Sequence, residues 1–253
     1  MRLPRLPMLL LSLGMLLGCF PRGDPSKPIP TVLVEAPRKA QRLVVVLPGR
    51  ADDLDDLRTS GIAQAVQAAW PDADVILAGL TLGYYFQGEP EQRLHQEIIL
   101  PALRRNYAQI WLVGASLGGM GAIQYDRAYP NQVTGTVLLA PYLGEKPVLA
   151  QIAAAGGLAL WQPPPRPAAV TQDNFEPELW RYLQTWQRNP SAARNVWLAY
   201  GDTDRLRNAV PLLAPALPAG HVLERKGGHD WSVWSPATRE VLMRVEEEGV
   251  AGR

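Results

Sequence analysis

The sequence lacks several features that define common classes of protein. It has one cysteine in 253 residues, so the chain cannot form an intrachain disulfide and its stability must come from its core. Acidic and basic residues nearly balance, 24 against 25, and no basic run is present, which argues against nucleic acid as a partner. Only three histidines occur, which leaves few candidates for a catalytic base.

Motifs for metals and for dinucleotides are also missing. The sequence has no His-x-x-x-His, cysteine-pair or calcium-loop spacing, so we predict no metal site. No Gly-x-Gly-x-x-Gly follows an early strand, so we expect no cofactor of the dinucleotide type. Asp52, Asp53, Asp55 and Asp56 crowd the start of a predicted helix, where we interpret them as solvated partners of the helix dipole.

The N-terminus has the pattern of a secretory signal. Arg2 and Arg5 precede the apolar run 8–17, and a glycine and a cysteine follow it. The run is shorter than the roughly 20 residues that cross a bilayer as a helix, so it favours a signal peptide over a membrane span.

Residues 16–19, Leu-Leu-Gly-Cys, resemble the bacterial lipobox. The resemblance implies that residues 1–18 are removed and that Cys19 is lipidated on its sulfur, which anchors the protein to a membrane of the cell envelope. Phe20 follows in place of aspartate, which favours the outer membrane and its periplasmic face. The alternative is an ordinary signal peptide that contains a cysteine. Residues 19–30 are rich in proline and predict a flexible tether.

After residue 30, apolar runs alternate with helix-like segments. The predicted strands cover residues 31–34, 43–47, 74–78, 110–113, 136–140, 195–200 and 221–225. The predicted helices cover residues 52–70, 90–106, 117–129, 145–155, 176–188 and 231–248, with an aromatic loop at 81–87. The alternation predicts one α/β domain over residues 31–253, with a mainly parallel sheet flanked by helices on both faces.

Residues 141–190 interrupt this alternation. Two helix-like pieces flank a proline-rich stretch, and Trp161, Trp180 and Trp186 fall in this segment. We expect an insertion over the carboxyl edge of the sheet, in which the tryptophans form either a lid over the substrate or a small core. Residues 84–86, Tyr-Tyr-Phe, either line a pocket or pack their own loop.

The sequence 114–119, Gly-Ala-Ser-Leu-Gly-Gly, joins a predicted strand to a predicted helix. A serine between glycines at such a junction is typical of a nucleophile elbow. The sharp turn predicts a positive φ at Ser116, and the glycines at 114 and 118 allow strand and helix to approach closely. We therefore expect Ser116 at the top of the sheet with an exposed hydroxyl.

The elbow, the strand order and the order of serine, acid and histidine together resemble the α/β-hydrolase superfamily. The resemblance covers nearly the whole chain after residue 30 and implies the α/β-hydrolase fold. Its acid follows a strand after the elbow, which favours Asp204 over the rival Asp202. Its histidine follows the last strand, which selects His229, because His95 precedes the elbow and His221 begins that strand.

The resemblance implies a serine hydrolase that cleaves a small-molecule carboxylic ester through an acyl-enzyme. His229 would take the proton of Ser116, and Asp204 would orient the imidazole. The backbone amides of Leu117 and Arg50 would bind the oxyanion, although the loop before Arg50 reads Pro-Gly where many members carry His-Gly.

Two other functions fit the same residues. Acyl transfer and thioester cleavage use the same triad, and the sequence does not separate them from ester hydrolysis. A non-catalytic binding module of the cell envelope is the second class, because a fold does not dictate a function. Complete triad candidates argue against the binding module. The sequence gives no indication of the oligomeric state.

Overall fold

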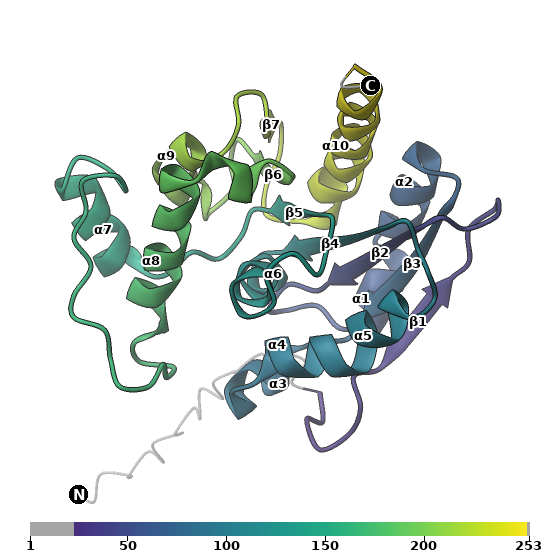
Figure 1. The fold of residues 1–253 in the computed structure, drawn as a ribbon, viewed down its shortest axis with the longest axis horizontal. Coiled ribbons are helices and arrows are strands. Elements are labelled where there is room, and N and C mark those ends of the chain that lie inside the picture. The colour runs from purple at the N-terminus through teal and green to yellow at the C-terminus, as the bar shows by residue number, and fades with distance from the viewer. Residues whose placement is uncertain (1–22, 252–253) are drawn as a thin grey trace, which may run out of the picture.

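The computed structural model describes residues 23–251, and the predicted signal peptide and Cys19 lie outside them. A seven-stranded sheet with the order β1-β3-β2-β4-β5-β6-β7 forms the centre of the domain (Figure 1). Its strands are β1 (Thr31–Val34), β2 (Arg42–Leu47), β3 (Ala73–Ala78), β4 (Gln109–Ala115), β5 (Gly135–Leu139), β6 (Val196–Gly201) and β7 (Val222–Arg225). Only the pair β1–β3 is antiparallel, so the predicted mainly parallel sheet is confirmed.

The central strands are continuous apolar runs because both faces of the sheet are covered. Along β2, Leu43, Val45 and Leu47 enter one hydrophobic cluster. Val44 and Val46, which point the other way, enter a second cluster on the opposite face. Alternate side chains of a strand point to opposite faces, so a strand buried on both sides needs an apolar residue at every position.

Helices cover each face of the sheet (Figure 1). On one face lie α1 (Leu54–Thr59), α2 (Ile62–Ala69) and α10 (Trp231–Ala251). On the other face lie α3 (Leu82–Gln87), α4 (Pro90–Leu94), α5 (Leu100–Leu103) and α6 (Leu117–Ala128). The insertion carries α7 (Lys146–Ala154) and α8 (Phe175–Arg188), and α9 (Val210–Leu213) follows β6.

Three predicted elements differ from the structure. The predicted helix 52–70 is two helices, because Gly61 adopts a left-handed φ of +76° between them. The predicted loop 81–87 contains α3, whose tyrosines Tyr84 and Tyr85 are buried, so tertiary packing stabilises a helix that its sequence does not favour. The predicted helix 90–106 widens to a π-turn over His95–Ile99, just before Pro101, which has no N–H to donate.

Part of the expected tether contacts the domain. Ile29 is buried, and its N–H donates to the Glu97 carboxylate at 2.6 Å. Arg93 donates to the carbonyl of Pro25 at 2.8 Å, and the Tyr84 hydroxyl donates to the carbonyl of Pro28 at 3.3 Å. Residues 25–29 are therefore attached to the helices α3 and α4 and to the π-turn.

The tryptophans of the insertion form a core and not a lid. Trp161, Trp180 and Trp186 are all buried. The indole N–H of Trp180 donates to the carbonyl of Leu143 at 2.6 Å, which ties α8 to the chain that leaves β5. Of the two alternatives predicted for these residues, the structure agrees with core packing, but the tryptophans join the large cluster on one face of the sheet and do not form a small core of their own.

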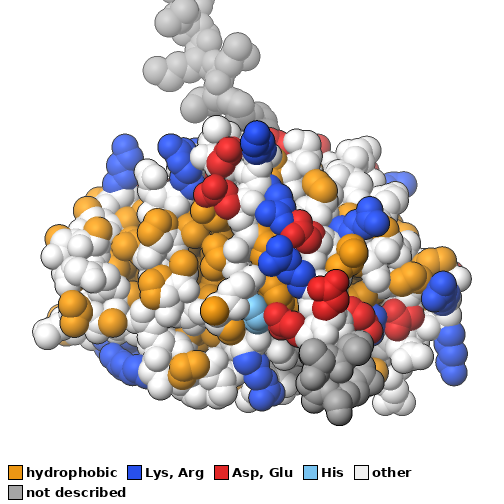
Figure 2. Space-filling model, turned by 90° about the horizontal axis from the view of Figure 1, so that it is seen from above, with side chains coloured by type: hydrophobic (Ala, Val, Ile, Leu, Met, Phe, Trp, Pro, Cys, Tyr) orange, Lys and Arg blue, Asp and Glu red, His pale blue; other side chains and the backbone are white. Residues whose placement is uncertain are grey.

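The surface agrees with the balanced charge of the sequence. On the face that Figure 2 shows, basic and acidic side chains are intermixed, with hydrophobic side chains between them. Among the helices of residues 23–251, none combines the length and the apolar character that a membrane span requires.

Candidate active site

Ser116 occupies a strained turn between β4 and α6. Its φ is +51° and its ψ is −110°, as the elbow predicts. A Cβ on Gly114 would lie 2.3 Å from the carbonyl oxygen of Gly118, and one on Gly118 would lie 2.6 Å from the carbonyl oxygen of Leu47. Side chains at these two positions would collide with backbone, so the glycines are required by the close approach of strand, helix and the end of β2.

The loop after β2 closes over the serine. A Cβ on Gly49 would lie 3.5 Å from the Cβ of Ser116, and Ser116 is only 4% exposed. This loop therefore covers most of the serine residue, and the exposure of its hydroxyl to a substrate stays a prediction. Leu117 begins α6 and Arg50 directly follows Gly49, so the two predicted oxyanion donors belong to adjoining segments. Their role stays a prediction.

Asp204 and His229 come together at the ends of β6 and β7. The imidazole Nδ1 lies 2.9 Å and 2.8 Å from the two carboxylate oxygens of Asp204. Asp204 is fully buried and also accepts the N–H of Leu206 at 2.7 Å. The rival Asp202 instead accepts the N–H of Gly227 at 3.0 Å. The structure thus brings His229 to Asp204 and not to Asp202.

The second nitrogen of His229 has no protein partner. Nε2 is buried and makes no hydrogen bond within residues 23–251. The ring packs edge-on against Trp234, with centroids 4.7 Å apart. If Nδ1–H donates to Asp204, the neutral imidazole presents a basic lone pair at Nε2. A buried acceptor without a hydrogen-bond partner costs free energy. The lone pair of Nε2 is therefore available to accept a proton from a hydroxyl.

The other histidines belong to the packing of the domain. His95 stacks on Tyr129 with centroids 4.0 Å apart, and its Nδ1 lies 3.0 Å from the Tyr125 hydroxyl. His221 stacks on Trp197 at 3.8 Å. Its Nδ1 lies 3.0 Å from the Val196 carbonyl, and its Nε2 lies 3.3 Å from the exposed carboxylate of Glu248, so both of its nitrogens are engaged within the domain.

Asp52 has a position that the sequence did not reveal. Its carboxylate accepts the N–H of Gly49 at 2.9 Å and the indole N–H of Trp231 at 3.0 Å. It therefore links the loop beside Ser116 to the loop of His229. The interpretation of Asp52 as a solvated partner of the helix dipole was wrong, since Asp53 is the residue that caps α1. The Asp52 N–H also donates to the Gly49 carbonyl at 3.2 Å, so a turn over residues 49–52 brings the carboxylate back to the Gly49 N–H.

The electrostatics of Asp52 follow from this position. Burial raises the pKa of the Asp52 carboxyl above its ordinary value, and the neighbouring Asp56 adds to that effect. The bonds from Gly49 and Trp231 and the proximity of His229 act in the opposite direction. Because the Gly49 N–H is bonded to Asp52, this amide is not a donor for an oxyanion.

A cavity of about 330 Å³ opens beside the elbow. It reaches Leu117 and Met120 of α6, Tyr85 and Phe86 of α3, and Phe175 of α8. Tyr85 and Phe86 therefore line a pocket, as one of the two predictions for this segment expects, whereas Tyr84 is buried and does not line it. Within residues 23–251, no group of three or more His, Cys, Asp or Glu side chains is placed to hold a metal ion.

Comparison with known proteins identifies the architecture. No protein-family model and no curated protein matches the chain. A solved ferulic acid esterase is 16% identical with a TM-score of 0.59, covering 86% of this chain and 96% of its own. The chain has the α/β-hydrolase fold.

Two further structures with the α/β-hydrolase fold are similar. Est1E from Butyrivibrio proteoclasticus is 12% identical with a TM-score of 0.59, covering 87% of this chain and 94% of its own. The monoacylglycerol lipase of Paleococcus ferrophilus is 15% identical with a TM-score of 0.55, covering 86% of this chain and 99% of its own. At these identities the likeness shows the fold alone, so the activity must be argued from the site.

Proposed function

We propose that the protein is a serine hydrolase that cleaves a carboxylic ester through an acyl-enzyme intermediate. The observation that carries the proposal is the pair of the buried Asp204 and the partly buried His229, whose imidazole Nε2 has no partner within residues 23–251. The pair and the strained Ser116 lie at the carboxyl ends of β6, β7 and β4, which is the edge where α/β folds form their sites. The structural relatives named above as esterases and a lipase support the same reaction class.

In the first half-reaction, Ser116 Oγ attacks the carbonyl carbon of the ester while His229 Nε2 takes the hydroxyl proton. The carbonyl π electrons move to the oxygen, and the amides of Leu117 and Arg50 bind the resulting oxyanion. When the oxyanion collapses, the bond from the carbonyl carbon to the alcohol oxygen breaks. The alcohol leaves with the proton from His229, and the acyl group stays on Ser116.

In the second half-reaction, water attacks the acyl-enzyme and loses its proton to His229. Collapse of the second oxyanion releases the carboxylic acid and returns the proton to Ser116. Asp204 stabilises the imidazolium that forms in each half-reaction and holds Nε2 toward the serine. The desolvated position of Asp204 strengthens this interaction, because a buried ion pair is screened less than an exposed one.

The test is hydrolysis of p-nitrophenyl acetate by the purified protein and by Ser116→Ala. We expect the variant to lose about 10⁴-fold or more in kcat, because a triad without its nucleophile retains only the contribution of binding and of the oxyanion donors. The control is Ser191→Ala, at an exposed serine far along the chain from the elbow. Unchanged hydrolysis by a folded Ser116→Ala protein would refute the proposal.

We also propose that Cys19 anchors the protein to the cell envelope. The support is the lipobox-like sequence 16–19 after a basic and then apolar leader. Metabolic labelling of cells with a fatty-acid analogue should label the wild-type protein and leave Cys19→Ser unlabelled. Equal labelling of both proteins would remove the anchor from the account and leave the hydrolase proposal untouched.

A further inference from the structure

Two cavities meet on the insertion side of the elbow. The first, of about 330 Å³, begins at Leu117, and the second measures about 370 Å³. Arg127 and Val170 line both cavities, so they mark the boundary that the two share. Ligand sites in proteins commonly have volumes of about 300–1,000 Å³, and each cavity lies within that range.

The first cavity is mainly apolar. Its hydrophobic wall is formed by Leu82, Tyr85, Phe86, Leu117, Met120 and Phe175. Phe86 is 49% exposed and Val170 is 46% exposed, although most large hydrophobic side chains of the domain are buried. An acyl chain or an aryl ring that covered these side chains would gain about 25 cal/mol for each Å² of apolar surface removed from water.

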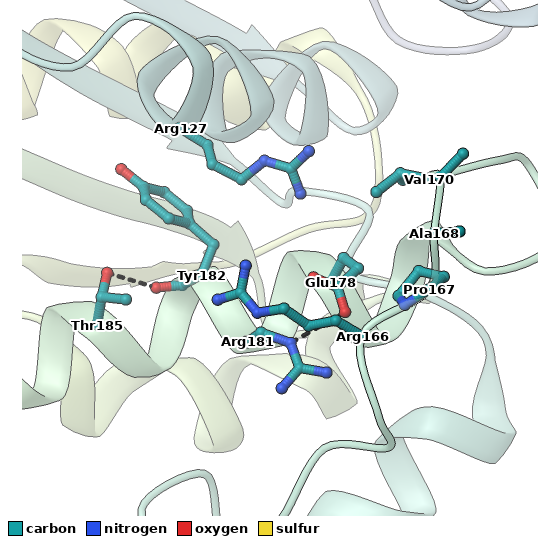
Figure 3. Close-up of a pocket in the computed structure, with 10 residues that line it drawn as sticks. Arg127, Arg166, Pro167, Ala168, Val170, Glu178, Arg181, Tyr182 and Thr185 are labelled. Carbon is teal, nitrogen blue, oxygen red and sulfur yellow. Dashed lines mark hydrogen bonds and ion pairs between the residues drawn. The ribbon is translucent and has the colours of Figure 1, made fainter.

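The second cavity is cationic. Arg127 of α6, Arg166 of the loop before α8, and Arg181 of α8 surround it (Figure 3). Arg181 is compensated, because it bonds to the Glu178 carboxylate at 2.9 Å and to the carbonyl of Pro164. Within residues 23–251, neither Arg127 nor Arg166 lies within ion-pair distance of a carboxylate. Three guanidinium groups and one carboxylate, that of Glu178, thus line the cavity, which leaves an excess of positive charge there.

Two carboxylates outside this cavity offset part of the excess. Asp126 accepts the hydroxyl of Tyr182, so it is held against that side chain. Glu91 lines the first cavity, where burial raises the pKa of its carboxyl and the charge of Arg127 opposes the rise. Like charges around one space repel, and an anion between them would remove that repulsion.

We propose that these cavities bind an ester with an apolar chain or ring and a negatively charged group. The apolar part occupies the cavity beside Leu117, and a carboxylate or phosphate is held by Arg127 and Arg166. The planar guanidinium group donates paired hydrogen bonds that match both of these anions. The claim that the ligand is a substrate rests on the proposed hydrolase function. The claim that the ligand binds in these cavities does not depend on that function.

The test measures binding without catalysis. Calorimetric titrations use the Ser116→Ala protein with three probes kept below micelle formation: octyl phosphate, octyl glucoside and inorganic phosphate. We expect octyl phosphate to bind about tenfold or more tightly than either of the others. Relative to octyl glucoside it gains hydrogen bonds between its charged phosphate and the arginines, and relative to inorganic phosphate it gains burial of the octyl chain. Each gain contributes about tenfold or more in affinity. Adding Arg127→Gln and Arg166→Gln should reduce octyl phosphate to the affinity of octyl glucoside.

Two further variants act as controls. Arg104→Gln removes an exposed arginine at the end of α5 and should leave all three affinities unchanged. Phe86→Ser should weaken both octyl ligands by the same factor. Equal affinity for the two octyl ligands, retention of the octyl phosphate preference without Arg127 and Arg166, or equal binding of inorganic and octyl phosphate would each overturn the inference. If the octyl phosphate preference appears while the wild-type protein hydrolyses no ester, the hydrolase proposal fails and the binding site stands.

Discussion

The carboxyl edge of the sheet and the insertion between β5 and β6 meet at one cavity, but different forces hold them in place. At the sheet edge, backbone geometry sets the positions: Ser116 sits at a positive φ, and Gly114 contacts helix backbone where a side chain would not fit. In the insertion, side-chain packing does so, through the buried Trp180 and Trp186. The comparison implies that changes at the edge should affect catalysis, whereas changes in the insertion should affect stability and choice of ligand.

The largest expected effect separates two acids at the sheet edge. Asp204→Asn should lower kcat for ester hydrolysis by about 10⁴-fold, because the amide no longer fixes the tautomer of His229 or stabilises its charged form. Asp202→Asn is the matched control and should stay within about threefold of wild type, since Asp202 bonds a loop amide and not the imidazole. A greater loss in Asp202→Asn than in Asp204→Asn would contradict the assignment.

Gly114→Ala tests the close approach at the elbow. The added Cβ would lie 2.3 Å from a helix carbonyl oxygen that cannot move alone, so we expect a loss of about 3 kcal/mol or more in the free energy of unfolding. Gly249→Ala in α10 meets no atom within 4 Å and should be neutral or stabilising by about 0.5–1 kcal/mol. Urea denaturation of both variants makes this comparison, and equal stabilities would show that the elbow is looser than described.

Two tryptophans of α8 provide a test within the insertion. Trp180→Phe removes the donor to the Leu143 carbonyl, whereas the indole N–H of Trp186 has no hydrogen-bond partner within residues 23–251. We expect Trp180→Phe to cost about 1–3 kcal/mol more than Trp186→Phe in thermal or urea unfolding. Both variants should hydrolyse p-nitrophenyl acetate at a rate close to wild type. A smaller loss of stability in Trp180→Phe than in Trp186→Phe would show that the bond from Trp180 to the Leu143 carbonyl does not hold the insertion in place.

The smallest effect concerns Asp52 and pH. Burial raises the pKa of this carboxyl in the folded protein, so its ionisation is disfavoured there. Its contribution to stability is therefore present below the unfolded pKa and is lost as pH rises through the folded pKa. As pH rises above the ordinary aspartate pKa of about 4, the wild-type free energy of unfolding should fall relative to that of Asp52→Asn. Exposed Asp55→Asn is the control, and an identical pH trend in both variants would contradict the expectation.

The sequence predicted the parts of the molecule that short-range backbone rules govern. Glycine spacing around Ser116 was sufficient for the elbow. The resemblance to the α/β-hydrolases, and not chain order alone, favoured Asp204 over Asp202 as the partner of His229. Asp52 was misread because its bond to Trp231 joins residues far apart in the chain. The helix α3 was missed because burial of Tyr84 and Tyr85 outweighs weak local propensity. The arginines around the second cavity come from α6 and the insertion, so no local pattern could have grouped them.

Covalent labelling shows whether Ser116 is an activated nucleophile: the intact mass of the protein is measured after reaction with a fluorophosphonate, beside the same reaction of Ser116→Ala. We expect one covalent adduct on the wild-type protein and none on the folded variant, because only a serine whose proton passes to His229 attacks the phosphorus readily. A folded wild-type protein without an adduct, or an equal adduct on Ser116→Ala, would contradict the claim that Ser116 is an activated nucleophile.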